Sequence, residues 1–168
     1  MHAMAELAKR SVETYIRECR IIEPPDPLPP EMQGKAGVFV SLKLHGKLRG
    51  CIGTFMPSCK SIGEEIMANA ISAATRDPRF EPVQVSELDE LSYSVDVLTC
   101  PEKVNDISEL DPRRYGVVVS SGYRRGLLLP DLEGVDSVEE QLRITKMKAG
   151  ILPDEDADIF RFEVVRYK

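Results

Sequence analysis

The sequence predicts an α+β fold in which duplicated hairpin–helix–strand units form a mainly antiparallel sheet flanked by helices. Short runs of alternating apolar and polar residues, typical of half-buried strands, recur along the 168-residue chain. Two Ser-x-x-Glu motifs, Ser61–Glu64 and Ser137–Glu140, each follow a hairpin pattern and mark the start of a helix. The chain is therefore predicted to be a single domain of two repeats, 37–98 and 113–168.

An amphipathic helix is predicted within residues 5–23, since apolar side chains recur there at helical spacing. They are Leu7, Val12, Tyr15, Ile16 and Cys19. Residues 24–36 are rich in proline, which lacks an amide donor and restrains the residue before it. This segment is predicted to be an extended connector, after which the body of the fold starts near Gly37.

Each repeat contains a hairpin, a helix and a further strand. In the first repeat these are Val38–Leu44 with Lys47–Ile52, a helix from Ser61 to Asp77-Pro78, and a strand over Leu91–Val97. In the second repeat they are Tyr115–Ser121 with Arg124–Leu129, a helix from Ser137 to Gly150, and a strand over Ile159–Val165.

The two repeats match at a constant offset of 76 residues. This offset takes Gly46 to Gly122, Arg49 to Arg125, Gly50 to Gly126, Ser61 to Ser137 and Glu64 to Glu140. The match indicates an internal duplication. The alternative, that two unrelated hairpin–helix units obey the same local rules, remains open.

Composition excludes several classes of protein. The net charge of −6 and the scattered cations disfavour general nucleic-acid binding, which usually depends on a basic stripe. No apolar run approaches a membrane span, and the N-terminus lacks a secretory layout, so a cytoplasmic protein is expected. Four cysteines without a Cys-x-x-Cys pair, and only two histidines, argue against a structural metal site. Most of the thiols are expected to be small buried apolar side chains.

The segment Leu48-Arg49-Gly50-Cys51-Ile52-Gly53-Thr54 is the predicted functional site. A three-residue loop, Leu44-His45-Gly46, is preferred over a two-residue turn, because His-Gly is a weak signal for a turn that needs positive φ twice. In that register Cys51 and Arg49 share one strand face, opposite an aliphatic face of Val40, Leu42, Leu48 and Ile52. The guanidinium is then expected to lower the pKa of the thiol.

Further residues are candidates for ligand binding. Gly50 and Gly53 remove side chains beside Cys51 and would let a ligand or another chain approach the backbone. Arg76, Asp77 and Arg79 follow the end of the first helix and form either a solvated helix terminus or an anion-binding corner. Arg125, the counterpart of Arg49 in the second repeat, is a further candidate.

No general base is predicted close to Cys51. His45 lies at the tip of the hairpin and His2 in the N-terminal segment, so a histidine-based dyad is disfavoured. Cys59, near the start of the helix at Ser61, is a second candidate for an activated thiol. The alternative, that Cys51 is simply a packed thiol on the hairpin, stays open.

The chain resembles the AMMECR family, named for a human chromosomal region tied to the AMME contiguous-gene syndrome. The resemblance rests on GVFVSLKLHGKLRGCIGTF from Gly37, AISAATRDPRF from Ala70, RRGLLLP from Arg124 and KAG at Lys148, and covers the chain from about Leu7 to its end. LRGCIGT is the hallmark of that family. The resemblance implies a duplicated α+β fold whose hallmark strand lines a cleft.

The resemblance implies no settled activity or cofactor. It suggests partnership with Memo-like or radical-SAM proteins, and family proposals range from translation or nucleic-acid machinery to an enzyme. Many relatives carry a cysteine just before the end of the second helix, where this chain has Lys146-Met147-Lys148, so a mechanism that needs that second thiol is in doubt.

Two main hypotheses follow. In the first, the protein is a thiol-dependent enzyme, or the partner of one, that acts on a small anionic substrate: Cys51 is the reactive thiol, Arg49 activates it, and Arg76, Arg79 or Arg125 orients the substrate. In the second, the cleft is a non-catalytic module that binds a protein or ligand, and Cys51 only packs. A factor associated with nucleic acid or translation is a third class, disfavoured by the negative charge.

Overall fold

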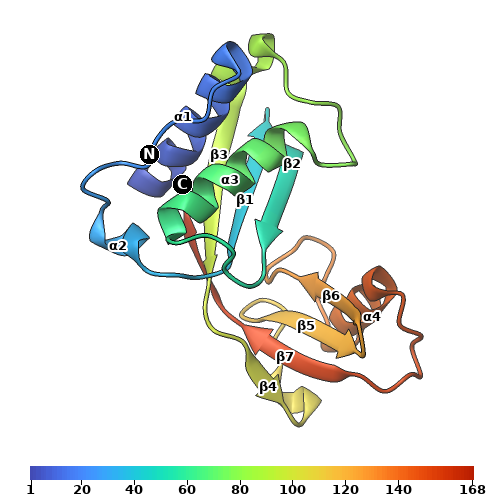
Figure 1. The fold of residues 1–168 in the computed structure, drawn as a ribbon. Coiled ribbons are helices and arrows are strands. Elements are labelled where there is room, and N and C mark those ends of the chain that lie inside the picture. Colours follow the sequence, from blue (N-terminus) through green and yellow to red (C-terminus); the bar gives the residue numbers. More distant parts are fainter. The chain divides into compact units, whose positions relative to one another are not determined.

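The computed structural model describes residues 1–168, which form two compact units. The first unit comprises residues 1–98 and 165–168, and the second comprises 99–164. Each unit contains a four-stranded sheet whose paired strands run antiparallel, together with helices, so the α+β prediction is confirmed (Figure 1). The strands belong to two separate sheets rather than to one. None of the helices combines the length and the apolar character that a membrane span requires.

The first unit is a sheet covered on one face by two helices. Its strands, in the order β2-β1-β3-β8, are β2 (Lys47–Thr54), β1 (Val38–Leu44), β3 (Leu91–Leu98) and β8 (Val164–Tyr167). Helices α1 (Ala3–Glu18) and α3 (Ile62–Thr75) pack against each other and against this sheet (Figure 1). The core lies between these layers and includes Val38, Val40 and Leu42, which are fully buried.

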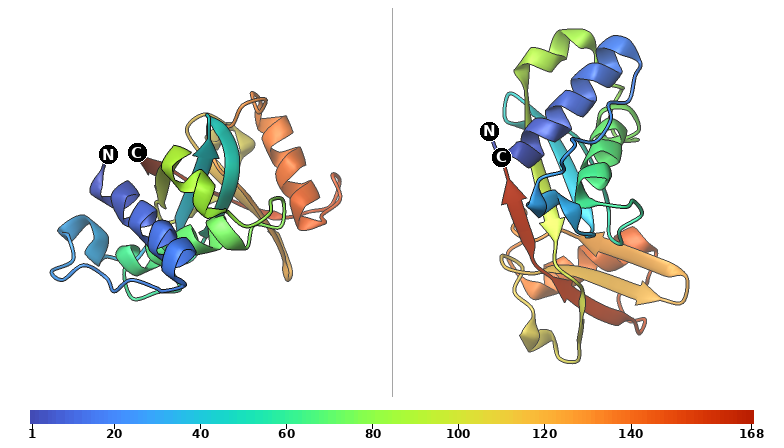
Figure 2. Two further views of the ribbon diagram at one scale, coloured as in Figure 1. Left: turned by 90° about the horizontal axis from the view of Figure 1, so that it is seen from above. Right: turned by 60° about the vertical axis from the view of Figure 1, so that its left-hand side comes forward.

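The Pro-rich connector is shorter than predicted, because a short helix, α2 (Pro30–Gln33), occupies part of it. Proline is accepted at the first position of a helix, where its missing N–H leaves no hydrogen bond unmade. A 3-10 helix, η1 (Val85–Glu90), precedes β3 and was also not predicted. The two chain ends meet within the first unit, where the His2 amide donates to the Lys168 carbonyl at 2.7 Å (Figure 2).

The turn of the first hairpin differs from the prediction. Leu44 pairs with Lys47, so the loop has two residues, His45 and Gly46, with φ values of 51° and 79°. Histidine is among the residues that tolerate positive φ better than most, and the His45 ring is held 3.0 Å from Glu90. This contact with a distant residue offsets the cost that led the sequence analysis to reject a two-residue turn.

A β-bulge in β2 reverses the side-chain directions that the two-residue turn would otherwise impose on the residues after Arg49. Lys43 pairs with Leu48 but Leu42 pairs with Gly50, so Arg49 is the extra residue of the bulge. Without it, the two-residue turn would direct Cys51 toward the core. With the bulge, Cys51 pairs with Ser41 and lies on the predicted face of the strand. Leu48, which was predicted to lie on the aliphatic face, is instead 41% exposed.

The second unit repeats this layout with a single long helix. Its strands, in the order β4-β7-β5-β6, are β4 (Glu102–Val104), β7 (Asp158–Phe162), β5 (Gly116–Ser121) and β6 (Arg124–Leu128). Helix α4 (Val138–Ala149) packs on β5 and β6, and the 3-10 helix η2 (Ile107–Glu109) follows β4. Gly150 ends α4 with a φ of 70°, as its predicted C-terminal position requires.

The last predicted strand is in fact two strands that belong to different sheets. β7 ends at Phe162 and β8 begins at Val164, and Glu163 between them belongs to neither. β7 pairs with β4 and β5, whereas β8 lies at the edge of the first sheet beside β3. An alternating pattern reports strand character but not the sheet that a strand joins, so the sequence could not show this division.

Residues that match between the two repeats have the same structural roles in the two units. In both sheets the first hairpin strand lies between its hairpin partner and the strand that follows the helix. The hydroxyl oxygens of Ser61 and Ser137 accept the amide hydrogens of Glu64 and Glu140, which caps α3 and α4. In both hairpins a glycine faces the backbone of the helix that follows.

Candidate functional site

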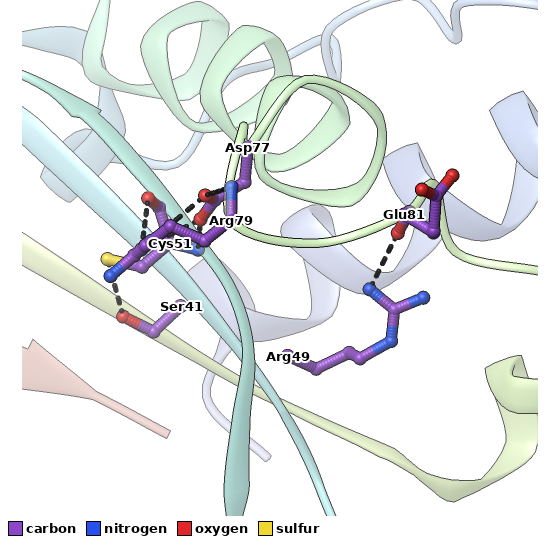
Figure 3. Close-up of polar contacts among 6 residues, drawn as sticks. All are labelled: Ser41, Arg49, Cys51, Asp77, Arg79 and Glu81. Carbon is purple, nitrogen blue, oxygen red and sulfur yellow. Dashed lines mark hydrogen bonds and ion pairs between the residues drawn. The ribbon is translucent and has the colours of Figure 1, made fainter.

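Cys51 lies on the sheet face directed away from α1 and α3. Its pairing partner across the β1–β2 ladder is Ser41, whose hydroxyl donates a hydrogen bond to the Cys51 sulfur at 3.2 Å (Figure 3). The thiol is half-buried. The alternation of β1 therefore places the hydroxyl and the thiol side by side while the neighbouring Val40 and Leu42 enter the core.

The backbone of Cys51 is held by the segment that follows α3. Because β2 is an edge strand, the N–H and C=O of Cys51 that point away from β1 need partners outside the sheet. Asp77 Oδ2 accepts the Cys51 N–H at 2.9 Å, and Arg79 Nη2 donates to the Cys51 carbonyl at 3.4 Å (Figure 3). Asp77 and Arg79 together, here called the edge clamp, take the place of a neighbouring strand.

Asp77 and Arg79 also bind each other. Arg79 donates through Nε to Asp77 Oδ1 at 3.0 Å and through Nη2 to Oδ2 at 2.7 Å. Hydrogen bonding from Arg79 lowers the pKa of Asp77 well below its ordinary value; burial opposes this shift, and the Cys51 amide adds to it. The Asp77 side chain is 2% exposed and that of Arg79 55%, so the anion lies inside and the cation faces solvent.

The pKa of the Cys51 thiol is raised, rather than lowered as predicted. Burial is the main influence and raises the pKa of Cys51, and nearby Asp96 and Asp77 act in the same direction. The hydrogen bond from Ser41 and the charge of Arg79 oppose this rise without overcoming it. A thiol with a raised pKa is protonated at neutral pH, whereas the thiolate is the nucleophilic form.

A second arginine–aspartate pair lies on the same face. Asp96, in β3, accepts two hydrogen bonds of 2.7 Å from Nε and Nη2 of Arg166 in β8. Its side chain is 3% exposed, while that of Arg166 is 37% exposed. Asp96 and Arg166 were not predicted as site residues from the sequence. The available signal was a lone carboxylate at an alternating position in an otherwise apolar and serine-rich strand.

The predicted partnership of Arg49 with Cys51 is wrong. The bulge turns Arg49 toward η1, where Nε and Nη2 donate to the carboxylate of Glu87 at 2.7 and 3.0 Å. Its Nη1 donates to the Glu81 carbonyl at 2.8 Å, away from the thiol (Figure 3). Arg49 is not among the groups that shift the pKa of Cys51. Its contacts anchor the 81–87 segment to the hallmark strand.

Packing within the first unit accounts for the two glycines of the hallmark. A Cβ on Gly50 would lie 2.2 Å from the Ala73 carbonyl oxygen of α3. A Cβ on Gly53 would lie 2.2 Å from the Phe39 ring, which covers this position from β1. The groups that approach these glycines closely are thus Ala73 and Phe39 of the same unit. Of the two predicted options, a ligand or another part of the chain, the structure shows the second.

Thr54 takes part in a buried polar network at the end of β2. Its hydroxyl donates to Glu65 at 2.6 Å, and the Asn69 amide donates to the Thr54 oxygen at 3.1 Å. The Glu65 carboxylate also accepts the amides of Ser58 and Cys59, at 3.0 and 2.8 Å. This network fixes the loop after the hallmark strand, and Glu65 was missed because its position looked like an ordinary first-turn helix residue.

The remaining candidates do not gather around Cys51. Leu48 and Arg76 are exposed, and the Arg76 backbone N–H ends α3 by donating to the Ser72 carbonyl at 2.7 Å. Arg125 lies in the second unit, on β6 opposite Ser120. Of the predicted cluster, the structure brings together Cys51, Asp77 and Arg79.

The other thiols lie in different surroundings from those predicted, whereas His45 lies at the hairpin tip as expected. Cys19 and Cys100 are exposed and Cys59 is half-buried, so none of the four thiols lies in the core. Burial raises the pKa of Cys59, contrary to the proposed activation at the helix start. His2 is the N-cap of α1, with Nδ1 accepting the Met4 amide at 3.3 Å. No group of three or more His, Cys, Asp or Glu side chains is arranged to hold a metal ion.

Comparison with known proteins identifies close relatives. A family model described as AMMECR1 matches residues 5–167. A protein of Thermotoga maritima is 55% identical over 170 residues, covering 99% of this chain and 98% of that protein. A protein of Thermococcus onnurineus is 43% identical, covering 95% of this chain and 85% of its own length. The crystal structure of an uncharacterised protein of Pyrococcus horikoshii superposes with a TM-score of 0.90 at 37% identity, over 97% of this chain and 88% of that one.

Proposed function

This chain belongs to the AMMECR1 family, and we propose that the sheet face around Cys51 binds an anionic group of a small molecule or partner protein, with Cys51 as a neutral part of the surface. The observation that carries this proposal is the pair of arginines on the sheet face that carries the thiol, with Arg79 at Cys51 and Arg166 at Asp96 of β3. Arg79 and Arg166 are each fixed by two hydrogen bonds to a buried aspartate.

The arrangement of charge favours an anion. The aspartate carboxylates are almost fully buried, whereas the Arg79 and Arg166 side chains are 55% and 37% exposed. A ligand in solvent therefore meets the cations first. A guanidinium whose orientation is already fixed loses less conformational entropy when it binds a carboxylate or phosphate.

The chemistry around the thiol supports binding rather than nucleophilic catalysis. The raised pKa keeps Cys51 protonated, and His45 is engaged with Glu90 at the tip of the hairpin. A Cys–His mechanism requires a base within hydrogen-bond reach of the sulfur. The second candidate is a thiol-dependent enzyme, and the contact that favours it is the Ser41 hydroxyl, whose 3.2 Å hydrogen bond stabilises the thiolate.

Binding is tested by titrating the isotope-labelled protein with inorganic phosphate and following the Cys51 amide and the Arg79 Nε–H by NMR. Arg79→Lys keeps the charge but loses the guanidinium that Asp77 holds in place, so the remaining N–H groups are no longer oriented and we expect phosphate to bind about tenfold more weakly. Cys51→Ser should retain affinity within about twofold. Arg17→Lys, which changes a half-exposed arginine on α1, is the matched control. Equal affinity in Arg79→Lys and the parent protein refutes the proposal.

The two functions also differ in the pH dependence of alkylation. With iodoacetamide at pH 7, Cys51 is expected to react at least about tenfold more slowly than the exposed Cys19 and Cys100, and to react appreciably only above the ordinary thiol pKa near 8.5. Site-resolved mass spectrometry of the native protein measures all four rates together. Preferential labelling of Cys51 at neutral pH would instead support the thiol-dependent enzyme.

We also infer that the two units arose by duplication within one family domain. The family match spans both units, and the offset of 76 residues joins residues with equivalent structural roles. Gly50 and Gly126 illustrate this equivalence, because a Cβ on either would meet a carbonyl oxygen of the following helix, at 2.2 and 2.4 Å. The factor associated with nucleic acid remains disfavoured by the net charge of −6.

A further inference from the structure

The second unit contains a polar cavity of about 370 Å³ that none of the hallmark residues lines. This volume is at the lower end of the range of roughly 300–1,000 Å³ found for small-molecule sites. The cavity is lined by Thr99, Cys100, Glu102, Arg114, Tyr115, Arg161, Phe162 and Glu163. These residues come from the start of β4 and the segment before it, from the segment before β5, and from the end of β7 and the residue after it, so strand pairing within this unit brings them together.

Two arginines are held in place around one tyrosine ring. The guanidinium carbons of Arg114 and Arg161 lie 4.8 and 4.4 Å from the centre of the Tyr115 ring. Arg114 Nε donates to Glu163 at 2.9 Å, and Arg161 Nε donates to Glu102 at 3.2 Å. Stacking and ion pairing fix the planes of both cations before any ligand arrives.

Hydrogen-bonding groups of both kinds remain unused in the cavity. Arg114 engages only its Nε, so its two terminal nitrogens still carry hydrogens without acceptors. The Thr99 hydroxyl oxygen accepts the Glu163 amide at 2.8 Å, which leaves its own hydrogen available. The Glu102 carboxylate receives Arg161 through Oε2, and its Oε1 has no donor.

The charges of the lining select the class of ligand. Two arginines and two glutamates balance, so a simple anion or cation would meet repulsion from one of the pairs. We propose that this cavity binds a small zwitterion of the α-amino-acid type. The ligand carboxylate pairs with the terminal nitrogens of Arg114, the ammonium pairs with Glu102, and the Tyr115 ring contacts its carbon skeleton.

Three related probes test this proposal on the full chain. L-Phenylalanine carries both charges, N-acetyl-L-phenylalanine only the negative one, and L-phenylalaninamide only the positive one. We expect calorimetry to show phenylalanine binding at least about tenfold more tightly than either relative, because each relative loses one charged hydrogen-bonding partner. Bound phenylalanine should also slow alkylation of Cys100 on the cavity wall but not that of the exposed Cys19.

Variants identify the groups that bind. Arg114→Gln should weaken phenylalanine binding about tenfold or more. The matched control is Arg113→Gln, since Arg113 is the adjacent residue but pairs with Asp131 and Asp136 and does not line the cavity. Should Arg114→Gln fail to fold, Glu102→Gln decides, because it removes a carboxylate that is 67% exposed and should cost a similar factor.

Three outcomes overturn the proposal. Equal binding of N-acetyl-L-phenylalanine and phenylalanine makes the cavity a simple anion site. Equal loss in the Arg113 and Arg114 variants shows that the binding takes place elsewhere. Absence of both a calorimetric signal and Cys100 protection at phenylalanine concentrations near its solubility limit shows that the cavity holds only solvent. These results concern residues of the second unit, so they are independent of phosphate binding at Cys51.

Discussion

Replacing Gly50 with alanine is expected to lower the free energy of unfolding by about 3 kcal/mol. The new Cβ would lie 2.2 Å from the Ala73 carbonyl oxygen, and real Cβ atoms do not approach other atoms so closely. Relief requires α3 to move away from β2. Both are backbone elements anchored in the core, so no flexible side chain can yield at low cost. Urea denaturation of the full chain measures the change.

Two further alanine substitutions show whether the cause is this close approach. Gly34→Ala is the control, since its Cβ would have its nearest neighbour at 3.9 Å, and a change within about 0.5 kcal/mol is expected. Gly126→Ala should be nearly as costly as Gly50→Ala, because its Cβ would lie 2.4 Å from the Thr145 carbonyl oxygen. Wild-type stability of both Gly50→Ala and Gly126→Ala would contradict the packing argument.

Replacing Asp77 with asparagine is expected to lower the free energy of unfolding by about 2–3 kcal/mol at pH 7. The substitution keeps the volume but removes the charge that accepts the Cys51 amide and three hydrogen bonds from Arg79, one from its backbone and two from its side chain. The expected loss in the free energy of unfolding is smaller than for a fully buried ion pair, because the Arg79 side chain is 55% exposed. The expected local consequence is a looser edge clamp, with faster hydrogen exchange at the Cys51 amide.

The effect of Asp77→Asn should depend on pH in a defined direction. Hydrogen bonds from Arg79 lower the folded-state pKa of Asp77, so the unfolded chain binds its proton more readily than the folded chain does. The stability that Asp77 contributes is therefore fully present above the ordinary carboxyl pKa of about 3.9. It is lost as the pH falls from about 5 toward the lowered folded-state value.

The measurement is the difference between the parent protein and Asp77→Asn in urea midpoints at pH 7, 5 and 3. Taking the difference removes the contributions of Glu65 and Glu87, whose pKa values are also lowered and which both proteins retain. Asp89→Asn is the control, because the Asp89 side chain is 86% exposed. We expect its urea midpoint to differ little from that of the parent protein at each pH. If the difference in urea midpoint between the parent protein and Asp77→Asn does not shrink between pH 5 and pH 3, the charge of Asp77 is not the source of the stability.

The strand face on which Cys51 lies was predictable, but the partners of Cys51 were not. The strand that carries Cys51 and the polar cluster of Asp77 and Arg79 after the first helix could be identified from local patterns, whereas the contact between them could not. The predicted neighbour Arg49 was wrong, because Arg49 pairs with Glu87, and the residue that pairs with Cys51 is Ser41. The two errors in the hairpin, an incorrect turn and an overlooked bulge, compensated each other, so the side on which Cys51 lies came out correctly.

What the sequence alone determined is the local structure: the alternation of β1, the serine caps of α3 and α4, and the glycine that ends α4. Each depends on residues within one or two turns, where periodicity and capping act directly. Tertiary structure alone decided the turn at His45, the bulge at Arg49 and the separation of β7 from β8. These features depend on contacts with residues far along the chain, such as Glu90 for His45 and Glu87 for Arg49, and no local pattern encodes such pairings.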